Sequence, residues 1–183
     1  EDEIKFDLNK IKLVTIDIEV AAEDGFPDVF NVAEELLLIT VQDYNTKFIT
    51  TFGSRPYETN PNRKNYRYVD CHSEEGLITT FVDWWQRNTP EVITGWNCEL
   101  YDIPYLMGRM ERIMGEKYAK RMSPWGICRR NEIKIAGRDN IAYDLAGISV
   151  IDYLDLYKKS PATPNQESFR LDHIALMELG QQK

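Results

Sequence analysis

Two carboxylates stand two residues apart in the apolar stretch KLVTIDIEV, at Asp17 and Glu19. Side chains alternate between the faces of a β-strand, so these two leave one face while Ile16 and Ile18 enter the core on the other. Neighbouring carboxylates repel each other and raise each other's pKa, and a divalent cation would remove that repulsion. The pair therefore indicates a metal site, with a solvated strand face as the alternative and commoner use of an isolated D-x-E.

A second group of polar residues follows a short apolar strand, in the stretch TGWNCELYDIPY at 94–105. Asn97 ends the strand, and Asp102 follows five residues later, at the expected N-cap of a helix with Pro104 in its first turn. Loops that leave strand ends are where sites are usually built. The structural alternative makes Asn97 a turn residue and Asp102 a cap and nothing more.

Composition narrows the class of protein. The chain has 183 residues, 43% of them hydrophobic, which suits one compact core. The longest apolar run, 36–39, is too short for a membrane helix, and the acidic first ten residues do not resemble a signal peptide.

A net charge of −8 argues against nonspecific duplex binding but allows a nuclease built on carboxylates. Three widely spaced cysteines, Cys71, Cys98 and Cys128, argue against disulfides and zinc, so we expect a reducing cytoplasm.

The elements that must hold these residues follow from periodicity and from turn residues. Strands are expected over 12–20, 36–43, 47–52, 66–70, 92–94 and 148–152, and a hairpin within 127–151 that turns at 137–140. Helices are expected over 74–88, 102–114, 116–122, 153–159 and 169–179, the last capped by Ser168 and stopped by Gly180. A meander followed by alternating strands and helices predicts an α/β fold, a mixed sheet with helices on both faces and an inserted β-hairpin.

Together the two motifs resemble the 3′→5′ exonuclease domain of family B DNA polymerases, most closely those of tailed bacteriophages. The first motif of that family is a D-I-E strand, here 17–19, and the second is G-W-N-x4-D, here 95–102, with Pro-Tyr following at 104–105. The stretches IDYLDLYKK at 151–159 and SFRL at 168–171 are also similar to family sequence. The resemblance covers nearly the whole chain.

The resemblance implies a ribonuclease H-like fold and a proofreading activity that hydrolyses the 3′-terminal phosphodiester of single-stranded or frayed DNA. It also implies two Mg²⁺ or Mn²⁺ ions. Asp17 would then contact both ions, Glu19 the ion that carries the attacking water, and Asp102 the other ion, while Asn97 would position the substrate.

Aromatic residues complete the expected substrate site. By the resemblance, Phe26 stacks on the terminal bases, and Trp96 and Tyr101 of the second motif also belong to the substrate side. The alternative for Phe26 is a loop aromatic that folds onto the core. The predicted hairpin matches one that helps hold separated strands in phage relatives, and its arginines, with ordinary solvated side chains as the alternative, are Arg129, Arg130 and Arg138.

The family completes its site with a third motif, Y-x-x-x-D, after the S-F-x-L segment, and this motif does not occur before Lys183. We therefore expect a C-terminally incomplete piece of a larger polymerase, impaired on its own. His173 and Glu178 approach the H-x-x-x-x-D of a sister branch, but the apolar residues around His173 favour a helix-surface histidine. Asp152 and Asp155 are interpreted as structural.

The expected partners are a single-stranded DNA 3′ end, the polymerase domains of the same chain and, through them, a sliding clamp, with no membrane and a host-cytoplasmic location. Two other functions stay open. One is a module that only binds single-stranded DNA, and the other is a ribonuclease H-like nuclease unrelated to replication, which the G-W-N-x4-D pattern disfavours.

Overall fold

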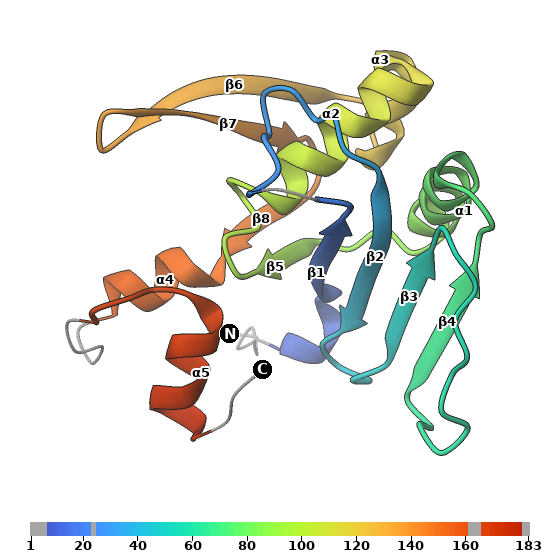
Figure 1. Ribbon diagram of the computed structural model, residues 1–183, viewed down its shortest axis with the longest axis horizontal. Helices are drawn as coiled ribbons and strands as arrows, with labels where there is room; N and C mark the ends of the chain where they lie inside the picture. Colours follow the sequence, from blue (N-terminus) through green and yellow to red (C-terminus); the bar gives the residue numbers. More distant parts are fainter. Residues whose placement is uncertain (1–6, 23–24, 161–165, 181–183) are drawn as a thin grey trace, which may run out of the picture.

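A mixed six-stranded sheet forms the centre of the molecule in the computed structural model, which describes residues 7–22, 25–160 and 166–180 (Figure 1). Its strands are β1 (Leu13–Val20), β2 (Leu36–Asp43), β3 (Ile49–Gly53), β4 (Tyr66–Asp70), β5 (Val92–Gly95) and β8 (Ser149–Asp152). They lie in the order β4-β3-β2-β1-β5-β8. β1, β2 and β3 form the antiparallel meander, whereas β4, β5 and β8 each pair in parallel with a neighbour.

Helices cover both faces of this sheet. They are α1 (Glu74–Arg87), α2 (Asp102–Met114), α3 (Glu116–Ala119), α4 (Tyr153–Lys159) and α5 (Leu171–Leu179), with 3-10 turns η1 (Leu8–Lys10) and η2 (Lys120–Met122). α1 contacts β2 and β3 and α2 contacts β1, while α4 and α5 lie towards the β5 and β8 end (Figure 1). This arrangement confirms the expected ribonuclease H-like α/β fold. Within the described ranges, no helix combines the length and apolarity that crossing a membrane requires.

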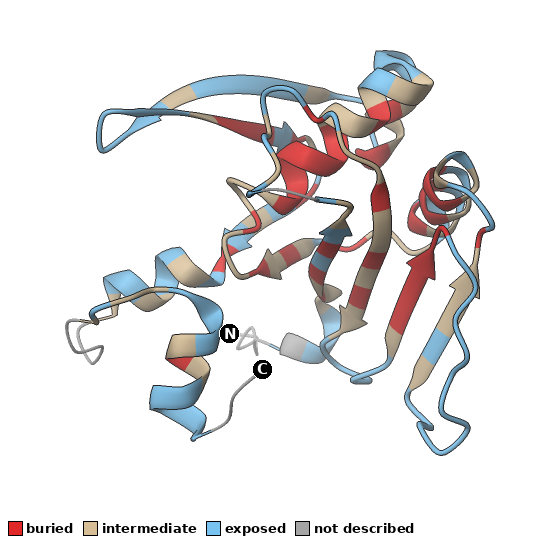
Figure 2. Cartoon of the chain, viewed as in Figure 1, coloured by how far each residue is buried: buried red, intermediate tan, exposed pale blue. Residues whose placement is uncertain are grey.

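The core lies between the sheet and the pair α1 and α2, where Figure 2 shows the buried residues gathered. Ile16 and Ile18 are 1% and 5% exposed, as the period of two along β1 predicts. The Arg109 guanidinium bridges the two helices by binding the Glu74 carboxylate at 2.7 Å, and both side chains are largely buried. Glu74 also accepts the Leu36 N–H at 2.7 Å, so one carboxylate joins α1, α2 and the start of β2.

Three local expectations were wrong. The hairpin β6 (Cys128–Ile135) and β7 (Arg138–Leu145) turns at Ala136 and Gly137, both at positive φ, and not at 137–140. A two-residue turn with this backbone matches the twist of the strands, so it displaces the longer polar turn. α5 begins at Leu171, because Ser168 caps only a local turn through the Arg170 N–H at 3.3 Å. The N-cap position of α2 is Tyr101, and Asp102 is its first helical residue.

Candidate active site

β1 carries Asp17 and Glu19 on the face turned away from α1 and α2. Both are exposed, while Ile16 and Ile18 between and beside them are buried. Hydrogen bonding to β2 fixes their spacing, with Asp17 opposite Thr40 and Glu19 opposite Leu38. The first motif is thus a rigid strand face, as the sequence predicts.

Asp102 reaches the same part of β1 from the start of α2. Its Oδ1 accepts the backbone N–H of Ile18, the residue between the two first-motif carboxylates, at 3.0 Å. β5 pairs with β1 only as far as Thr15 and Thr94, so beyond that point the Asp102 carboxylate supplies the acceptor that a longer strand would have supplied. The expected capping role was wrong, because this side chain binds the neighbouring strand and makes no cap hydrogen bond.

Burial, followed by the nearby charge of Asp17, raises the pKa of Asp102 to about 7, against the lowering effect of the Ile18 N–H. Asp102 is 4% exposed, so its charge is poorly solvated. Asp17 and Asp102 therefore lie close enough to repel each other. A cation between them would favour the charged form of both.

The loop between β5 and α2 depends on Gly95 and Asn97. A Cβ on Gly95 would lie 2.7 Å from the Ile16 carbonyl oxygen and 2.8 Å from the Cys98 Cβ, so only glycine permits this approach to β1. Asn97 has φ 64°, in the left-handed region that asparagine tolerates better than most residues. The G-x-N spacing thus has a backbone reason as well as a chemical one.

Asp152, at the end of β8, holds this loop in place. Its Oδ1 accepts the N–H groups of Asn97 at 3.1 Å and Leu154 at 2.9 Å, and its Oδ2 accepts that of Glu99 at 3.0 Å. One buried carboxylate therefore caps α4 and fixes the second motif. The structural interpretation of Asp152 is confirmed. The sequence did not reveal that its partner is the loop of the second motif.

Phe26 and Tyr101 form an aromatic pair beside the carboxylates. Their ring centroids are 4.5 Å apart, and Phe26 is 77% exposed, so the alternative in which Phe26 folds onto the core is wrong. Burial raises the pKa of Tyr101 to about 12, with further contributions from the charges of Asp102, Glu19, Glu34 and Asp17. The Tyr101 hydroxyl therefore lies within electrostatic reach of all three predicted catalytic carboxylates.

Trp96 and Asn97 make other contacts. The Trp96 indole donates to the Phe169 carbonyl at 3.1 Å and packs near Tyr153 and Tyr157, which joins the second motif to α4 and to the segment before α5. Asn97 lines a small hollow of ≈ 190 Å³ together with Asp152 and the hairpin residues Ile133 and Ile135. Neither is brought against Phe26 in the way that Tyr101 is.

The residues set aside in the sequence have local partners. Asp155 binds Lys159 at 2.6 Å on α4, and Glu178 accepts the Tyr157 hydroxyl at 2.6 Å. His173 lies half-buried on α5.

The expected hairpin arginines are exposed. Arg129 pairs with Asp144 at 3.2 Å and Arg130 with Glu132 at 2.7 Å, both on the hairpin itself, and Arg138 lies next to its turn. The sequence identifies their position, and their role towards a strand stays a prediction.

Hard divalent cations prefer carboxylate oxygens, so the donor types of Asp17, Glu19 and Asp102 fit Mg²⁺ or Mn²⁺. The raised pKa of Asp102 beside Asp17 is the observation that fits a cation best. In the part of the chain that the structure describes, however, no group of three or more His, Cys, Asp or Glu side chains is arranged to hold a metal ion. The donor types of these three residues nevertheless suit the ion.

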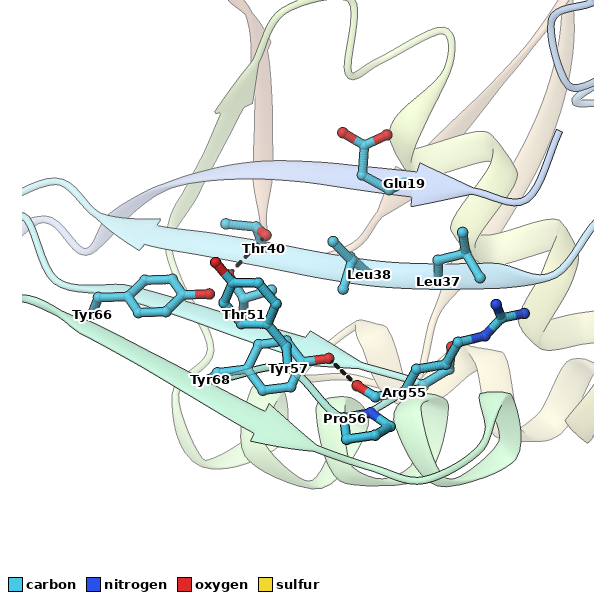
Figure 3. Close-up of a pocket in the computed structure, with 11 residues that line it drawn as sticks. Glu19, Leu37, Leu38, Thr40, Thr51, Arg55, Pro56, Tyr57, Tyr66 and Tyr68 are labelled. Atoms are coloured by element: carbon cyan, nitrogen blue, oxygen red, sulfur yellow. Dashed lines mark hydrogen bonds between the residues drawn. The ribbon is translucent and has the colours of Figure 1, made fainter. Parts of the chain in front are cut away.

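Two hollows flank the first motif on its exposed face. Asp17 borders one of ≈ 770 Å³, walled by Trp96, Tyr157 and apolar residues of α4 and α5. Glu19 borders another of ≈ 490 Å³, lined by three tyrosines (Figure 3). Sequence reasoning missed these tyrosines, because they lie in a stretch interpreted only as a polar loop and a short strand. A signal for two of them was present, since R-K-N-Y-R-Y at 63–68 places basic residues next to Tyr66 and Tyr68.

Comparison with known proteins agrees with the motifs. Residues 1–174 match the family described as DNA polymerase family B, exonuclease domain. The DNA-directed DNA polymerase of Escherichia phage RB69 is 33% identical over 97% of this chain and 22% of its own length, and that of Enterobacteria phage T4 is 30% identical over 94% and 22%. The DNA polymerase catalytic subunit of Elephantid herpesvirus 1 is 26% identical over 98% of this chain.

The chain spans 22% of the length of the two phage polymerases. A family match over residues 1–174 and the two motifs on a ribonuclease H-like sheet lead to one conclusion. This chain belongs to the family B DNA polymerases, within their exonuclease domain.

Proposed function

We propose that this chain is the proofreading 3′→5′ exonuclease domain of a DNA-directed DNA polymerase. It would hydrolyse the 3′-terminal phosphodiester of single-stranded or frayed DNA and release nucleoside monophosphates. The observation that carries the proposal is the hydrogen bond from Ile18 to Asp102, which brings a buried carboxylate to the strand segment of Asp17 and Glu19. Membership of the family supports the same reaction.

We assign Asp17, Glu19 and Asp102 as the catalytic residues and as ligands of two divalent cations, Mg²⁺ or Mn²⁺. Asp17 would contact both ions, Glu19 one and Asp102 the other. Such a pair of ions, when bound, supplies a hydroxide nucleophile and stabilises the charge on the leaving 3′ oxygen. The protein's own part is to hold two carboxylates on an exposed strand face and a third at a buried helix start, where water competes less for that third carboxylate.

The exposed ring of Phe26, supported by Tyr101, is the proposed platform for the terminal bases. Stacking tolerates every base, which suits an enzyme that removes whichever nucleotide is wrong. Asn97 and Trp96 stay in the proposed substrate site. The Asn97 N–H is bound to Asp152 and the Trp96 indole to the Phe169 carbonyl. We therefore propose that these two residues act by holding the loop between β5 and α2 beside β1.

A second candidate is a module that binds single-stranded DNA without cutting it. One observation favours it, namely that no three-ligand metal group is assembled among the described residues. The intact Asp17, Glu19 and Asp102 favour the nuclease.

The deciding experiment uses the polymerase chain that contains these residues and a labelled primer with a mismatched 3′ end. Asp17→Ala should lower nucleotide release at least about 100-fold, the scale expected for damage to a metal site, while primer extension persists. The control is Asp155→Ala, which removes an exposed carboxylate paired with Lys159. Unchanged release from Asp17→Ala overturns the assignment, and strand binding without release by the unmodified chain supports the second candidate.

We further propose that the partners are a DNA 3′ end, polymerase domains on the same chain and a sliding clamp reached through those domains, in the cytoplasm of a host cell. Pull-down of a clamp by the polymerase chain, with and without these residues, tests whether this domain takes part.

A further inference from the structure

The hollow beside Glu19 has a wall of aromatic rings. Tyr57, Tyr66 and Tyr68 line it over β2, β3 and β4, and Figure 3 shows their rings gathered on the same side of the sheet. The Tyr57 and Tyr68 centroids are 5.4 Å apart, with the rings tilted by 52°. The Tyr68 hydroxyl donates to the Arg55 carbonyl, so its ring is already fixed in place. A volume of ≈ 490 Å³ lies within the range of small-ligand sites.

A buried polar group in the same wall has no partner. Ser54 is 3% exposed and lines the hollow, and its Oγ makes no hydrogen bond within the described ranges. Buried hydroxyls are nearly always hydrogen-bonded, but this Oγ is itself covered, so a ligand that brings its own donor or acceptor reaches it only if the wall shifts to expose it. The edge of a nucleobase offers both.

The segment that carries the tyrosines is basic although the chain is acidic, while the hollow itself is lined by one basic side chain, Arg55, and one acidic side chain, Glu19. Residues 54–68 contain four basic side chains, Arg55, Arg63, Lys64 and Arg67, and one acidic side chain, Glu58, whereas the whole chain has a net charge of −8. All five are exposed. Arg55 approaches Glu35 at 3.6 Å, but both side chains are solvated, so this pair is weak and gives way readily to a phosphate.

A second hollow continues the first. It has a volume of ≈ 610 Å³ and is lined by Lys47, Arg63 and Lys64 among others, and Tyr66 belongs to both walls. The Arg63 guanidinium lies 5.7 Å from the centre of the Tyr66 ring. A group of aromatic rings is therefore followed by a group of basic side chains along one path that starts at Glu19, with Tyr66 shared between them.

We propose that this path, the tyrosine track, is a binding site for single-stranded DNA that leads away from the catalytic carboxylates. It starts beside Glu19, and its members are Ser54, Tyr57, Tyr66 and Tyr68, then Lys47, Arg63 and Lys64. Bases stack on the rings and phosphates contact the basic side chains, the combination that binds single strands without sequence preference. Only the direction of the strand, with its 3′ end at Asp17 and Glu19, rests on the proposed function.

The test is fluorescence anisotropy on the whole chain in EDTA, with two oligothymidylates. One has about 12 nucleotides and is long enough to cover the track, and the other has about three and is too short to cover it. Tyr57→Ala should weaken binding of the longer oligonucleotide about fivefold to 100-fold, the effect of losing one base stack, and change the shorter less than about twofold. Tyr57 is 63% exposed, so the variant keeps its fold, which a thermal melt checks. The matched control is Trp125→Ala, which removes an aromatic ring that is 71% exposed and outside the track.

A charge variant probes the other half of the track. Arg63→Ala with Lys64→Ala should weaken binding of the longer oligonucleotide and reduce its salt dependence by about 1.4 in log–log slope, two phosphates at about 0.7 each. Arg87→Ala with Lys117→Ala, two exposed basic residues elsewhere, is the control and should leave the slope unchanged.

The outcomes separate this inference from the proposed function. Equal affinity of wild type and Tyr57→Ala for the longer oligonucleotide overturns the track, even where Mn²⁺ supports hydrolysis. Loss of affinity in both track variants, without hydrolysis in Mn²⁺, supports the track and counts against the nuclease.

Discussion

Asp17 and Asp102 carry the same chemical group in opposite surroundings. Asp17 stands on the exposed face of β1, whereas Asp102 is 4% exposed and has its pKa raised to about 7 by burial and by Asp17. The first motif needs only a strand with the correct period. The second needs a loop that approaches β1 through Gly95 and is held by Asp152. Changes in the second motif should therefore affect stability, while changes in exposed residues should affect only function.

The largest effect is expected from Gly95→Ala. The new Cβ would meet a backbone oxygen of Ile16 at 2.7 Å, and backbone does not yield cheaply. We expect the free energy of unfolding to fall by about 3 kcal/mol, typical of overpacking a rigid contact. Denaturant unfolding followed by fluorescence measures it. Ser149→Ala, at an exposed position of β8, is the control, and equal midpoints for the two variants would show that the loop adapts.

Asp152→Ala should come next. It leaves the N–H groups of Asn97, Glu99 and Leu154 without their acceptor, which we expect to lower stability by about 2–3 kcal/mol. Asp155→Ala, three residues on and solvent-exposed, should change stability by less than about 0.5 kcal/mol. Parallel urea titrations check the pair. If the two variants unfold at the same concentration, the loop is not held by Asp152.

Asp102→Asn should act in the opposite direction. The folded-state pKa of about 7 lies above the ordinary value of 3.8, so the stability from the neutral carboxyl is fully present below about pH 4 and is lost as the pH rises through about 7. Asparagine stays neutral, so the variant should be more stable than wild type by about 2–4 kcal/mol at pH 8 and nearly equal at pH 4.

Thermal melts of both proteins in EDTA across this pH range test the prediction. A constant difference in stability between the two proteins at every pH would mean that ionisation of Asp102 does not destabilise the folded protein.

Phe26→Ala should have the smallest effect on folding. Its ring is 77% exposed and touches Tyr101, so stability should change by less than about 0.5 kcal/mol. Binding of a short oligonucleotide should nevertheless weaken about fivefold to 100-fold. Anisotropy beside a thermal melt gives both values. A lower melting temperature with unaltered affinity would place Phe26 in a structural role.

The difference between the two motifs also explains what the sequence revealed. The alternation in β1 places Asp17 and Glu19 correctly, because a period of two depends only on local residue types. The role of Asp102 depends on where β5 stops beside β1. Its hydrogen-bond donor, the N–H of Ile18, lies 84 residues away in the sequence, and no local pattern reveals a contact over that separation. Its position near a helix start was predictable, but the strand it binds was not.

The same reasoning applies outside the motifs. The hairpin was predictable, but its turn was not, since Ala136 at positive φ goes against residue preference and is imposed by the pairing of β6 with β7. The tyrosines of β4 could be predicted as a strand, whereas their hollow requires β2, β3 and the loop after β3 together.

The hydrogen bond between Ile18 and Asp102 also affects how the molecule can move. One oxygen of Asp102 is anchored to the backbone of β1, so the start of α2 must follow any displacement of that strand. We expect this hydrogen bond to limit movement of the helix start relative to the strand segment of Asp17 and Glu19. It also fixes the direction in which the Asp102 carboxylate faces that strand.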